Sequence, residues 1–410
     1  MDKIRIGIFG TGRGSSFIAS IIANGGEIVA LCDKNNEKMK VAIERIGSDV
    51  KCYNDFDEFI EHPMDAVLLC NYFHEHAPYA IRCLEKNIHV ISECTANSTL
   101  AEGVALVRAA EKSKAFYMLC ENYPFMLFNR EMKRICEGGT LGKILYGEGE
   151  YNHAGNSYSD ASKKDLFDSV EHWRNFLPRT YYITHSLAPI AYATGALPVR
   201  VTAMPVFAPA PEDSNSAAHV GEIAAIITCL NDDKSVFKVT GHASFGASYN
   251  SYRVCGKKGQ FENVRGTDNM VMLRYNKWST PEGMEEINYY KPDLGDANIE
   301  ALKKAGHGGG DFFVIREFLN CIRENRRPTM DVYFATRLAS TAIMAHRSLM
   351  EYGVPYDVPD FRNPEDCAKY ENDTLSPFYY SDGREPTFPC CSDPEYKPSA
   401  QQIENFKKLI

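Results

Sequence analysis

The sequence predicts an α/β protein: an N-terminal Rossmann fold with a doubly wound parallel sheet, then an α+β domain with a large, mostly antiparallel open sheet. Two observations carry this prediction. Up to about residue 125, apolar strand runs such as "KIRIGIF" alternate with helical patterns such as "HAPYAIRCLEKN", which is typical of a parallel sheet covered on both faces. From residue 126, runs such as "VRVTAMPVF" and "EIAAIITCL" are separated by turn signals, as in an antiparallel sheet. Two helical patterns after them are expected to pack on one face of that sheet.

Three segments follow from these patterns in the 410 residues. Residues 1–125 are predicted to form the dinucleotide-binding Rossmann domain, and residues 126–360 the α+β domain. Residues 361–410 are rich in Pro, Asp, Ser and Tyr. They are expected to form an irregular arm that either wraps the body or reaches a neighbouring subunit.

A glycine-rich loop after the first strand predicts a dinucleotide site. Gly10, Gly12 and Ser15 occupy the three positions of the fingerprint, which allows a tight turn and a close approach of the backbone to a pyrophosphate. Asp33 ends the second strand, where a carboxylate can accept both ribose hydroxyls. It favours NAD, with NADP less expected, because a 2′-phosphate would meet a like charge; Lys34 weakens that preference. The loop residues expected at the cofactor are Gly10, Gly12, Arg13, Gly14 and Ser15.

The tips of the later strands carry further polar side chains, and ligands bind at this edge of an open parallel sheet. His74 and His76 could instead be surface residues at a helix start, and Glu121 could cap a helix. Thr99 and Glu102 have the spacing of a capping box, so Thr99 is expected to begin a helix. The tip residues expected at the cofactor are Asn71, His76, Glu93 and Asn122.

Charge and cysteine content narrow the classes of partner. A net charge of −9 and a pI near 5.7 argue against a non-specific nucleic-acid binder. There is no apolar run long enough to span a membrane and no leader pattern at the first residues, so a cytoplasmic protein is expected. The 13 cysteines include no CxxC motif, and no His, Cys or Asp set has metal spacing, so no metal is expected.

The order of motifs resembles the Gfo/Idh/MocA oxidoreductases from about residue 4 to residue 361. The motifs that carry this resemblance are "HVISECTANST", "CENYPF", "GGTLGKI", "HWR", "THSLAPIAYATG" and "GGGDFFVIREF". The resemblance implies a sugar, cyclitol or related substrate. It also implies a homo-oligomer, a dimer or tetramer, built through the sheet of the second domain.

Two departures from that family leave one candidate base. Where the family usually carries Glu-Lys-Pro, this chain has Glu93-Cys94-Thr95, and an un-ionised thiol cannot replace an ammonium. Where family dehydrogenases often have Asp, it has Tyr181. His185 remains, and an imidazole titrates near the working pH of a general base. Tyr182 is expected to assist, as a second base if its pKa is lowered.

The remaining candidates are expected at the substrate. Arg174 could hold a substrate oxygen or carboxylate or form a structural ion pair, and Tyr151 and His153 could instead be ordinary sheet residues. His307 precedes three glycines that suit a closing loop, although Asp311 as a helix cap would explain part of that pattern. The residues expected at the substrate are Glu93, Cys94, Tyr151, His153, Trp173, Arg174 and His307.

The predicted function is an NAD-dependent oxidoreductase that transfers a hydride between a nicotinamide and a sugar or glycoside hydroxyl at the sugar 3-position. The spelling "YITHSLAP" also looks like the NAD-dependent glycosidase branch of this family, including enzymes for N-acetylgalactosaminides. That likeness implies an alternative, a redox-neutral cycle of oxidation, elimination, hydration and reduction with retained NAD. A third reading is a non-catalytic sensor that binds dinucleotide.

Overall fold

The fold comes from a computed structural model that describes residues 3–154, 166–293, 295, 301–302 and 305–410. Six parallel strands form the first sheet in the order β3-β2-β1-β4-β5-β6. The strands are β1 (Ile4–Phe9), β2 (Gly26–Cys32), β3 (Lys51–Tyr53), β4 (Ala66–Leu69), β5 (His89–Ser92) and β6 (Tyr117–Leu119). This order is the doubly wound arrangement, so the predicted Rossmann fold is confirmed.

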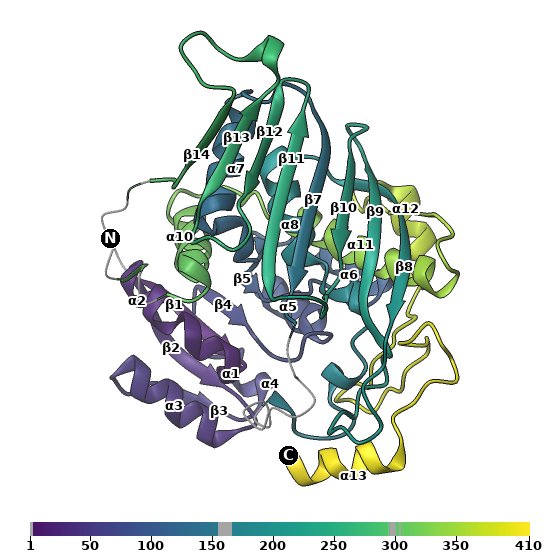
Figure 1. The fold of residues 1–410 in the computed structure, drawn as a ribbon. Coiled ribbons are helices and arrows are strands. Elements are labelled where there is room, and N and C mark those ends of the chain that lie inside the picture. Colours follow the sequence, from purple (N-terminus) through teal and green to yellow (C-terminus); the bar gives the residue numbers. More distant parts are fainter. Residues whose placement is uncertain (1–2, 155–165, 294, 296–300, 303–304) are drawn as a thin grey trace.

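Helices follow the strands of this sheet in turn (Figure 1). They are α1 (Thr11–Gly14), α2 (Ile18–Ala23), α3 (Asn36–Ile46), α4 (Phe56–Phe59), α5 (His76–Glu85) and α6 (Leu100–Lys112), with a 3-10 turn over Ser15–Phe17. The predicted capping box is confirmed: Thr99 accepts from the backbone N–H of Glu102, whose carboxylate accepts from that of Thr99. Two of the four N–H groups that a helix start leaves unpaired are satisfied in this way.

The second sheet has nine strands among the described residues, in the order β14-β13-β12-β11-β7-β10-β9-β8-β15. All neighbouring pairs are antiparallel except β7 and β10, as predicted. The strands are β7 (Ile144–Asn152), β8 (Pro198–Phe207), β9 (Glu222–Asn231), β10 (Val236–Thr240), β11 (Tyr249–Gly256), β12 (Gly259–Asn263), β13 (Val271–Tyr275), β14 (Ile287–Tyr290) and β15 (Tyr356–Asp357).

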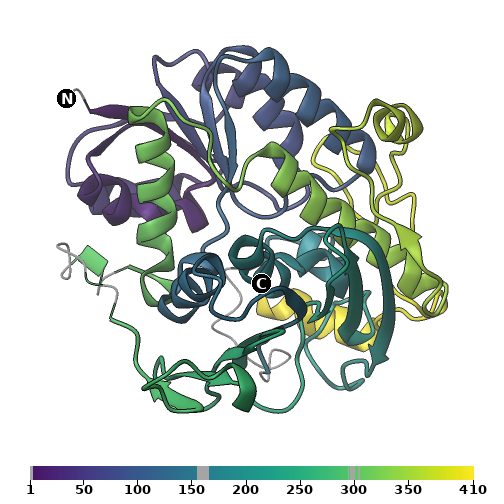
Figure 2. The ribbon, with the colours of Figure 1, turned by 90° about the horizontal axis from the view of Figure 1, so that it is seen from above.

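Helices α7 (Leu127–Glu137), α8 (Thr184–Thr194) and α11 (Val332–Met350) lie against this sheet. Helix α10 (Gly310–Arg323) does not: it packs on α2 of the first domain, where Arg323 donates to the Asn24 carbonyl at 2.6 Å. Figure 2 shows it, in light green, beside the purple N-terminal elements. The expectation that this helix covers the second sheet was therefore wrong, because its apolar face is buried by the Rossmann domain.

The C-terminal arm, with α12 (Pro364–Tyr370) and α13 (Ala400–Leu409), wraps the body of its own chain, which decides between the two alternatives left by the sequence. Phe378 is fully buried, with its ring 4.7 Å from that of His74. The Tyr380 hydroxyl lies 2.8 Å from that of Ser98. The arm is thus part of the folded core rather than an appendage.

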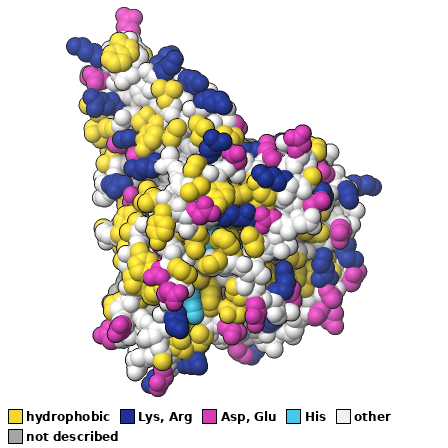
Figure 3. Space-filling view, turned by 90° about the vertical axis from the view of Figure 1, so that its right-hand side faces the viewer, with side chains coloured by type: hydrophobic (Ala, Val, Ile, Leu, Met, Phe, Trp, Pro, Cys, Tyr) yellow, Lys and Arg dark blue, Asp and Glu magenta, His cyan; other side chains and the backbone are white. Residues whose placement is uncertain are grey.

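The surface that carries β8 and the arm mixes apolar, basic and acidic side chains (Figure 3). No large region of one charge stands out on this face. Among the described residues, no helix has both the length and the apolar character needed to cross a bilayer.

We expect the arm to contribute measurably to stability. Phe378→Ala should lower the free energy of unfolding by about 3–5 kcal/mol, because it removes a buried ring and leaves a cavity. Leu375→Ala is the matched control, since Leu375 lies in the same arm but is 39% exposed. Urea unfolding of both variants checks this, and equal losses would contradict the packing described here.

Two histidines anchor the arm and should make the protein sensitive to acid. His74 donates to the Tyr379 carbonyl at 2.8 Å, and His346 to the Pro389 carbonyl at 2.7 Å. Burial lowers the pKa of His74 to about 3 and that of His346 to about 4.

Both folded pKa values lie below that of an unfolded histidine, so between pH 6.5 and about 4 only the unfolded chain takes up these protons. Stability should therefore be complete above pH 6.5 and fall below it, by about 2 kcal/mol per histidine at pH 5. Unfolding in urea at pH 7.5 and pH 5 measures the difference. His346→Gln should remove its share of the loss; an unchanged pH slope in this variant would refute the assignment.

Candidate active site

The glycine loop between β1 and α2 has the shape of a phosphate cradle. Gly10 has a φ of +90°, and a Cβ there would lie 2.3 Å from the Cys70 carbonyl, so only glycine fits. A Cβ on Gly14 would lie 2.5 Å from the Ile8 side chain. A Cβ on Gly12 would meet nothing nearer than Lys38 at 3.7 Å, so the protein itself does not require glycine there. The free space at Gly12 fits the close approach of a ligand.

The third fingerprint position works differently from the sequence expectation. Gly14, not Ser15, makes the close contact between helix and strand. Ser15 is buried, and its hydroxyl donates to the Thr11 carbonyl at 2.5 Å. A serine is tolerated there because its polar group is satisfied inside the turn.

Asp33 stands at the end of β2 beside this loop. One carboxylate oxygen accepts from the backbone N–H and the hydroxyl of Thr11, at 2.7 and 2.8 Å, and the other from the backbone N–H of Asn35 at 2.8 Å. These bonds hold the carboxylate in place while Oδ1, which accepts only one of them, keeps acceptor capacity. The position fits an adenosine ribose.

Three predicted cofactor residues keep a buried polar atom without a partner among the described residues: Asn71 Oδ1, Asn122 Oδ1 and His76 Nε2. The opposite end of each side chain is used by the protein, for example Asn122 Nδ2, which donates to Asp311 at 2.6 Å. Buried polar groups are normally paired. The residues present therefore fit a polar ligand such as a dinucleotide along this edge.

The alternative of His74 and His76 as surface residues is wrong. They are 2% and 1% exposed, because the loop after β4 is covered by the arm and by the segment after β5. Whether His76 contacts the cofactor stays a prediction.

Arg13 links the cofactor loop to two other elements. Its guanidinium forms ion pairs with Glu93 at 2.8 Å and with Asp311 at 2.9 Å. Asp311 is fully buried, and although burial raises its pKa, the hydrogen bonds from His307 and Arg13 hold that pKa below its usual range. The interpretation of Asp311 as a helix cap is wrong, since Gly309 is the N-cap of α10. The side chains of Arg13 and Glu93 already pair with each other, so their predicted ligand contacts stay predictions.

The centre of the site is a carboxylate–imidazole pair. His185, in the first turn of α8, donates through Nδ1 to the two carboxylate oxygens of Glu121, at 2.8 and 2.9 Å. Glu121 is fully buried just after β6. Burial alone would raise its pKa, but the contact with His185 holds the pKa below its usual range. Glu121 is therefore ionised, and the Nε2 edge of His185 is left to accept a proton.

Three tyrosines enclose the imidazole. Tyr123 stacks on His185 with ring centroids 4.2 Å apart, and Tyr151 and Tyr182 meet it edge-on at 4.7 and 4.8 Å. Burial raises the pKa of Tyr182 well above its ordinary value. The phenol therefore stays protonated. Tyr182 is expected to act as a second base only if its pKa is lowered, and this condition is not met. Tyr182 can act only as a hydrogen-bond donor or acceptor.

Cys94 contacts the Glu121 member of this pair. Its thiol donates to Glu121 at 3.1 Å. Burial raises the pKa of Cys94 well above its ordinary value, and the neighbouring carboxylates add to that rise. The position of the family lysine therefore carries a neutral thiol.

Cys94, Glu121 and His185 lie close enough to hold a metal ion, with one ligand atom of each within 4.8 Å of the others. The hydrogen bonds described above already pair all three side chains with one another. That no metal binds here stays a prediction.

Arg174 lies over the Trp173 ring at 4.2 Å, and Trp173 stacks on Phe73 at 5.2 Å. The Arg174 side chain is exposed to solvent. The protein atoms packed around it nevertheless remove part of its hydration and lower its pKa, while the nearby Tyr182 and Tyr151 act to raise that pKa. It forms no ion pair with any residue that the structure describes. The alternative of a structural ion pair is thus not supported, and the guanidinium stands available beside the tyrosines.

His153 and His307 lie at the rim. His153 is exposed and packs on Tyr151 with ring centroids 4.4 Å apart. His307 is exposed, pairs with Asp311 at 3.2 Å and lies 5.8 Å from the Tyr123 ring. Their predicted contacts with substrate remain untested.

Sequence reasoning missed two residues of this centre. The sequence places Glu121 at a strand tip beside the cofactor or at a helix cap, and not as the partner of His185. It does accept from the Tyr123 N–H at 3.2 Å, but it also holds His185. Tyr123 was not considered. Both belong to "CENYPF", directly after a buried strand, and this position in a parallel sheet was the available signal.

The comparisons divide the chain into two matches. Residues 4–120 match the model of the Gfo/Idh/MocA oxidoreductase family, NAD-binding Rossmann fold. Residues 212–365 match the model of the glycosyl hydrolase 109 C-terminal domain. The first match confirms the NAD-binding character of the N-terminal domain.

Relatives of similar length match most of the chain. A glycosyl hydrolase family 109 protein of Shewanella pealeana is 24% identical over 403 residues, covering 88% of this chain and 86% of the relative. An alpha-N-acetylgalactosaminidase of Shewanella oneidensis is 23% identical over 401 residues, covering 88% and 85%.

Solved structures share the fold. Levoglucosan dehydrogenase in complex with NADH and levoglucosan superposes with a TM-score of 0.73 at 17% identity, covering 87% of this chain and 100% of the other. The aldose-aldose oxidoreductase of Caulobacter crescentus, complexed with glycerol, gives a TM-score of 0.68 at 19% identity, covering 87% and 99%.

Proposed function

We propose that this chain, whose residues 4–120 match the Gfo/Idh/MocA oxidoreductase family and whose residues 212–365 match the glycosyl hydrolase 109 C-terminal domain, is an NAD-dependent glycosidase that works through oxidation of a sugar hydroxyl. The observation that carries the proposal is the buried Glu121–His185 pair inside its tyrosine cage. It provides a positioned base for a carbinol proton at the edge of the NAD-binding sheet.

Glu121 holds the proton on Nδ1 of His185, so Nε2 accepts the proton of the sugar hydroxyl. The carboxylate then stabilises the imidazolium that forms, as in carboxylate–histidine pairs of other enzymes. Bound NAD supplies the hydride acceptor and, later, the donor. Tyr182, kept protonated by its raised pKa, donates a hydrogen bond to the sugar oxygen. Arg174 holds a second substrate oxygen through its free guanidinium.

Oxidation at the sugar 3-position would acidify the neighbouring C–H, so that elimination can expel the aglycone. Water then adds, and the hydride returns to the sugar. The net reaction is hydrolysis without redox change. The matches to glycosyl hydrolase 109, one relative being named an alpha-N-acetylgalactosaminidase, support this route and raise it above the plain oxidoreductase that the sequence placed first.

The second candidate is that plain oxidoreductase, a net sugar dehydrogenase. The fold neighbours favour it, since levoglucosan dehydrogenase was crystallised with NADH and levoglucosan. The third reading, a non-catalytic dinucleotide sensor, predicts that His185→Ala changes no activity.

We expect the pair itself to be essential for turnover. Glu121→Gln should lower kcat by roughly 10²–10⁴-fold, because the carboxylate no longer stabilises the imidazolium. The dissociation constant for NAD should change less than about twofold. Glu131→Gln is the matched control, since Glu131 is equally buried but lies on α7 and pairs with Arg134. Full activity of Glu121→Gln would remove the pair from the mechanism.

We propose NAD rather than NADP as the cofactor, because Asp33 stands at the end of β2 beside the glycine loop, where its carboxylate would accept ribose hydroxyls and repel a 2′-phosphate. Asp33→Ser should weaken NAD binding by about tenfold, since it removes the acceptor for two hydroxyls, and should weaken NADP binding much less. Calorimetric titration with both cofactors measures this. A stronger effect on NADP would reverse the cofactor assignment.

A panel of nitrophenyl glycosides tests the reaction, following nitrophenol and the absorbance of reduced cofactor together, with and without added NAD. The glycosidase predicts nitrophenol release without accumulation of NADH. Accumulation of NADH in step with sugar oxidation would support the dehydrogenase. The α-N-acetylgalactosaminide is the first substrate to test, given the name of the relative.

A further inference from the structure

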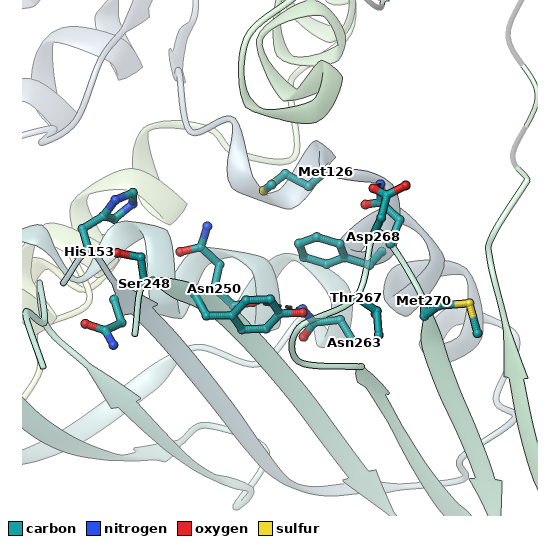
Figure 4. A pocket seen from close by; sticks show the side chains of 12 residues that line it. Met126, His153, Ser248, Asn250, Asn263, Thr267, Asp268 and Met270 are labelled. Carbon is teal, nitrogen blue, oxygen red and sulfur yellow. Dashed lines mark hydrogen bonds between the residues drawn. The ribbon is translucent and has the colours of Figure 1, made fainter. Parts of the chain in front are cut away.

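A cavity of about 310 Å³ opens next to the reaction centre. It lies where β7 ends, β11 begins and the connection between β12 and β13 turns (Figure 4). His153 and Ser248 stand at one end and Thr267 and Asp268 at the other, with Met126 across from the sheet. None of the steps proposed above uses this cavity.

The polar part of the cavity lining is almost neutral. Asn250 lies in the middle, and its Oδ1 has no partner among the described residues. The hydroxyl of Thr267 donates to the Val264 carbonyl at 2.7 Å and keeps its acceptor capacity. Asp268 already pairs with Lys291 at 3.2 Å. These groups suit a ligand with several hydroxyls rather than an anion or a purely apolar group.

Apolar surface lines the rest of the cavity, from Phe128, the Tyr249 ring and Met126. Small-molecule sites typically combine such surface with a few convergent polar groups, and their volumes begin at roughly 300 Å³. A sugar ring presents both hydroxyls and apolar C–H faces. The size and the chemistry of the cavity therefore fit one such ring.

Two chains of contacts connect the cavity to His185. Burial raises the pKa of Tyr123, and the nearby side chain of Asn250 acts against that rise; Tyr123 in turn stacks on His185. From the other side, His153 packs on Tyr151, which meets the imidazole edge-on. A ring in the cavity would thus lie one side chain away from the base along either chain of contacts.

We propose that this cavity is a second sugar subsite, which binds the leaving-group side of the glycoside. The substrate would then be a di- or oligosaccharide rather than a glycoside of a small alcohol. This inference rests on the proposed function in one respect, that the bond between the two rings is the one that is cleaved. The binding of the second ring does not depend on turnover.

The test compares binding of disaccharides with binding of the methyl glycosides of their non-reducing sugars. The protein is loaded with NAD and titrated by calorimetry or ligand-observed NMR. The panel carries N-acetylgalactosamine, N-acetylglucosamine, galactose or glucose, in α and β linkage to galactose or glucose. At least one disaccharide should bind about tenfold more tightly than its methyl glycoside.

Two variants test whether the tighter binding of the disaccharide depends on the cavity. Thr267→Trp fills the cavity from one end and Ser248→Trp from the other, and both positions are exposed, so the fold should tolerate them. Each should abolish the tenfold advantage while the methyl glycoside binds within about twofold of wild type. Thr374→Trp, on the exposed surface of the arm, is the control and should keep the advantage.

The outcomes separate this inference from the proposed function. A disaccharide advantage that persists in both cavity variants, or its absence across the panel, overturns the subsite. Release of nitrophenol from aryl glycosides without any disaccharide advantage overturns the subsite alone. A disaccharide advantage that the variants abolish, without release of aglycone or formation of NADH, supports the subsite and overturns the glycosidase.

Discussion

The site depends on one interaction, the hydrogen bonds between His185 and Glu121. A buried carboxylate without a partner is costly, so the imidazole must stay where it can pair with it. Glu121 follows the last strand of the first sheet and His185 begins a helix on the second sheet. The pair therefore fixes the distance between the two sheets at the point where a nicotinamide and a sugar would meet. Beside it, the ion pair of Arg13 and Asp311 ties the glycine loop to α10.

Substituting a thiol for the family lysine changes the electrostatics of this centre. Cys94 brings no positive charge and stays protonated next to Glu121. The carboxylate is thus compensated by His185 and by neutral donors alone. His185 gains its charge only when it takes the substrate proton, and no permanent cation holds an alkoxide in place. Such a base suits a reaction in which the proton must later be returned to the sugar.

Much of the fold could be predicted from the sequence because its signals are local. The Rossmann strands, the Thr99 capping box and the placement of Asp33 beside the glycine loop depend on residues close in the chain. The Glu121–His185 pair spans 64 positions, and no local pattern states which carboxylate a histidine will meet. The same holds for Asp311, whose partner Arg13 lies 298 positions away, and for the raised pKa of Tyr182, which arises from burial by distant elements.

Trp173 stacks on Phe73, and the ring of Phe73 is tilted against that of Phe378 with centroids 6.3 Å apart. The C-terminal arm thereby supports the segment that carries Arg174, the residue proposed to hold a substrate oxygen. During synthesis on the ribosome this support would be completed last, after both sheets have formed. In a nascent chain the glycine loop beside Asp33 would thus be in place before the packing around Arg174 is complete.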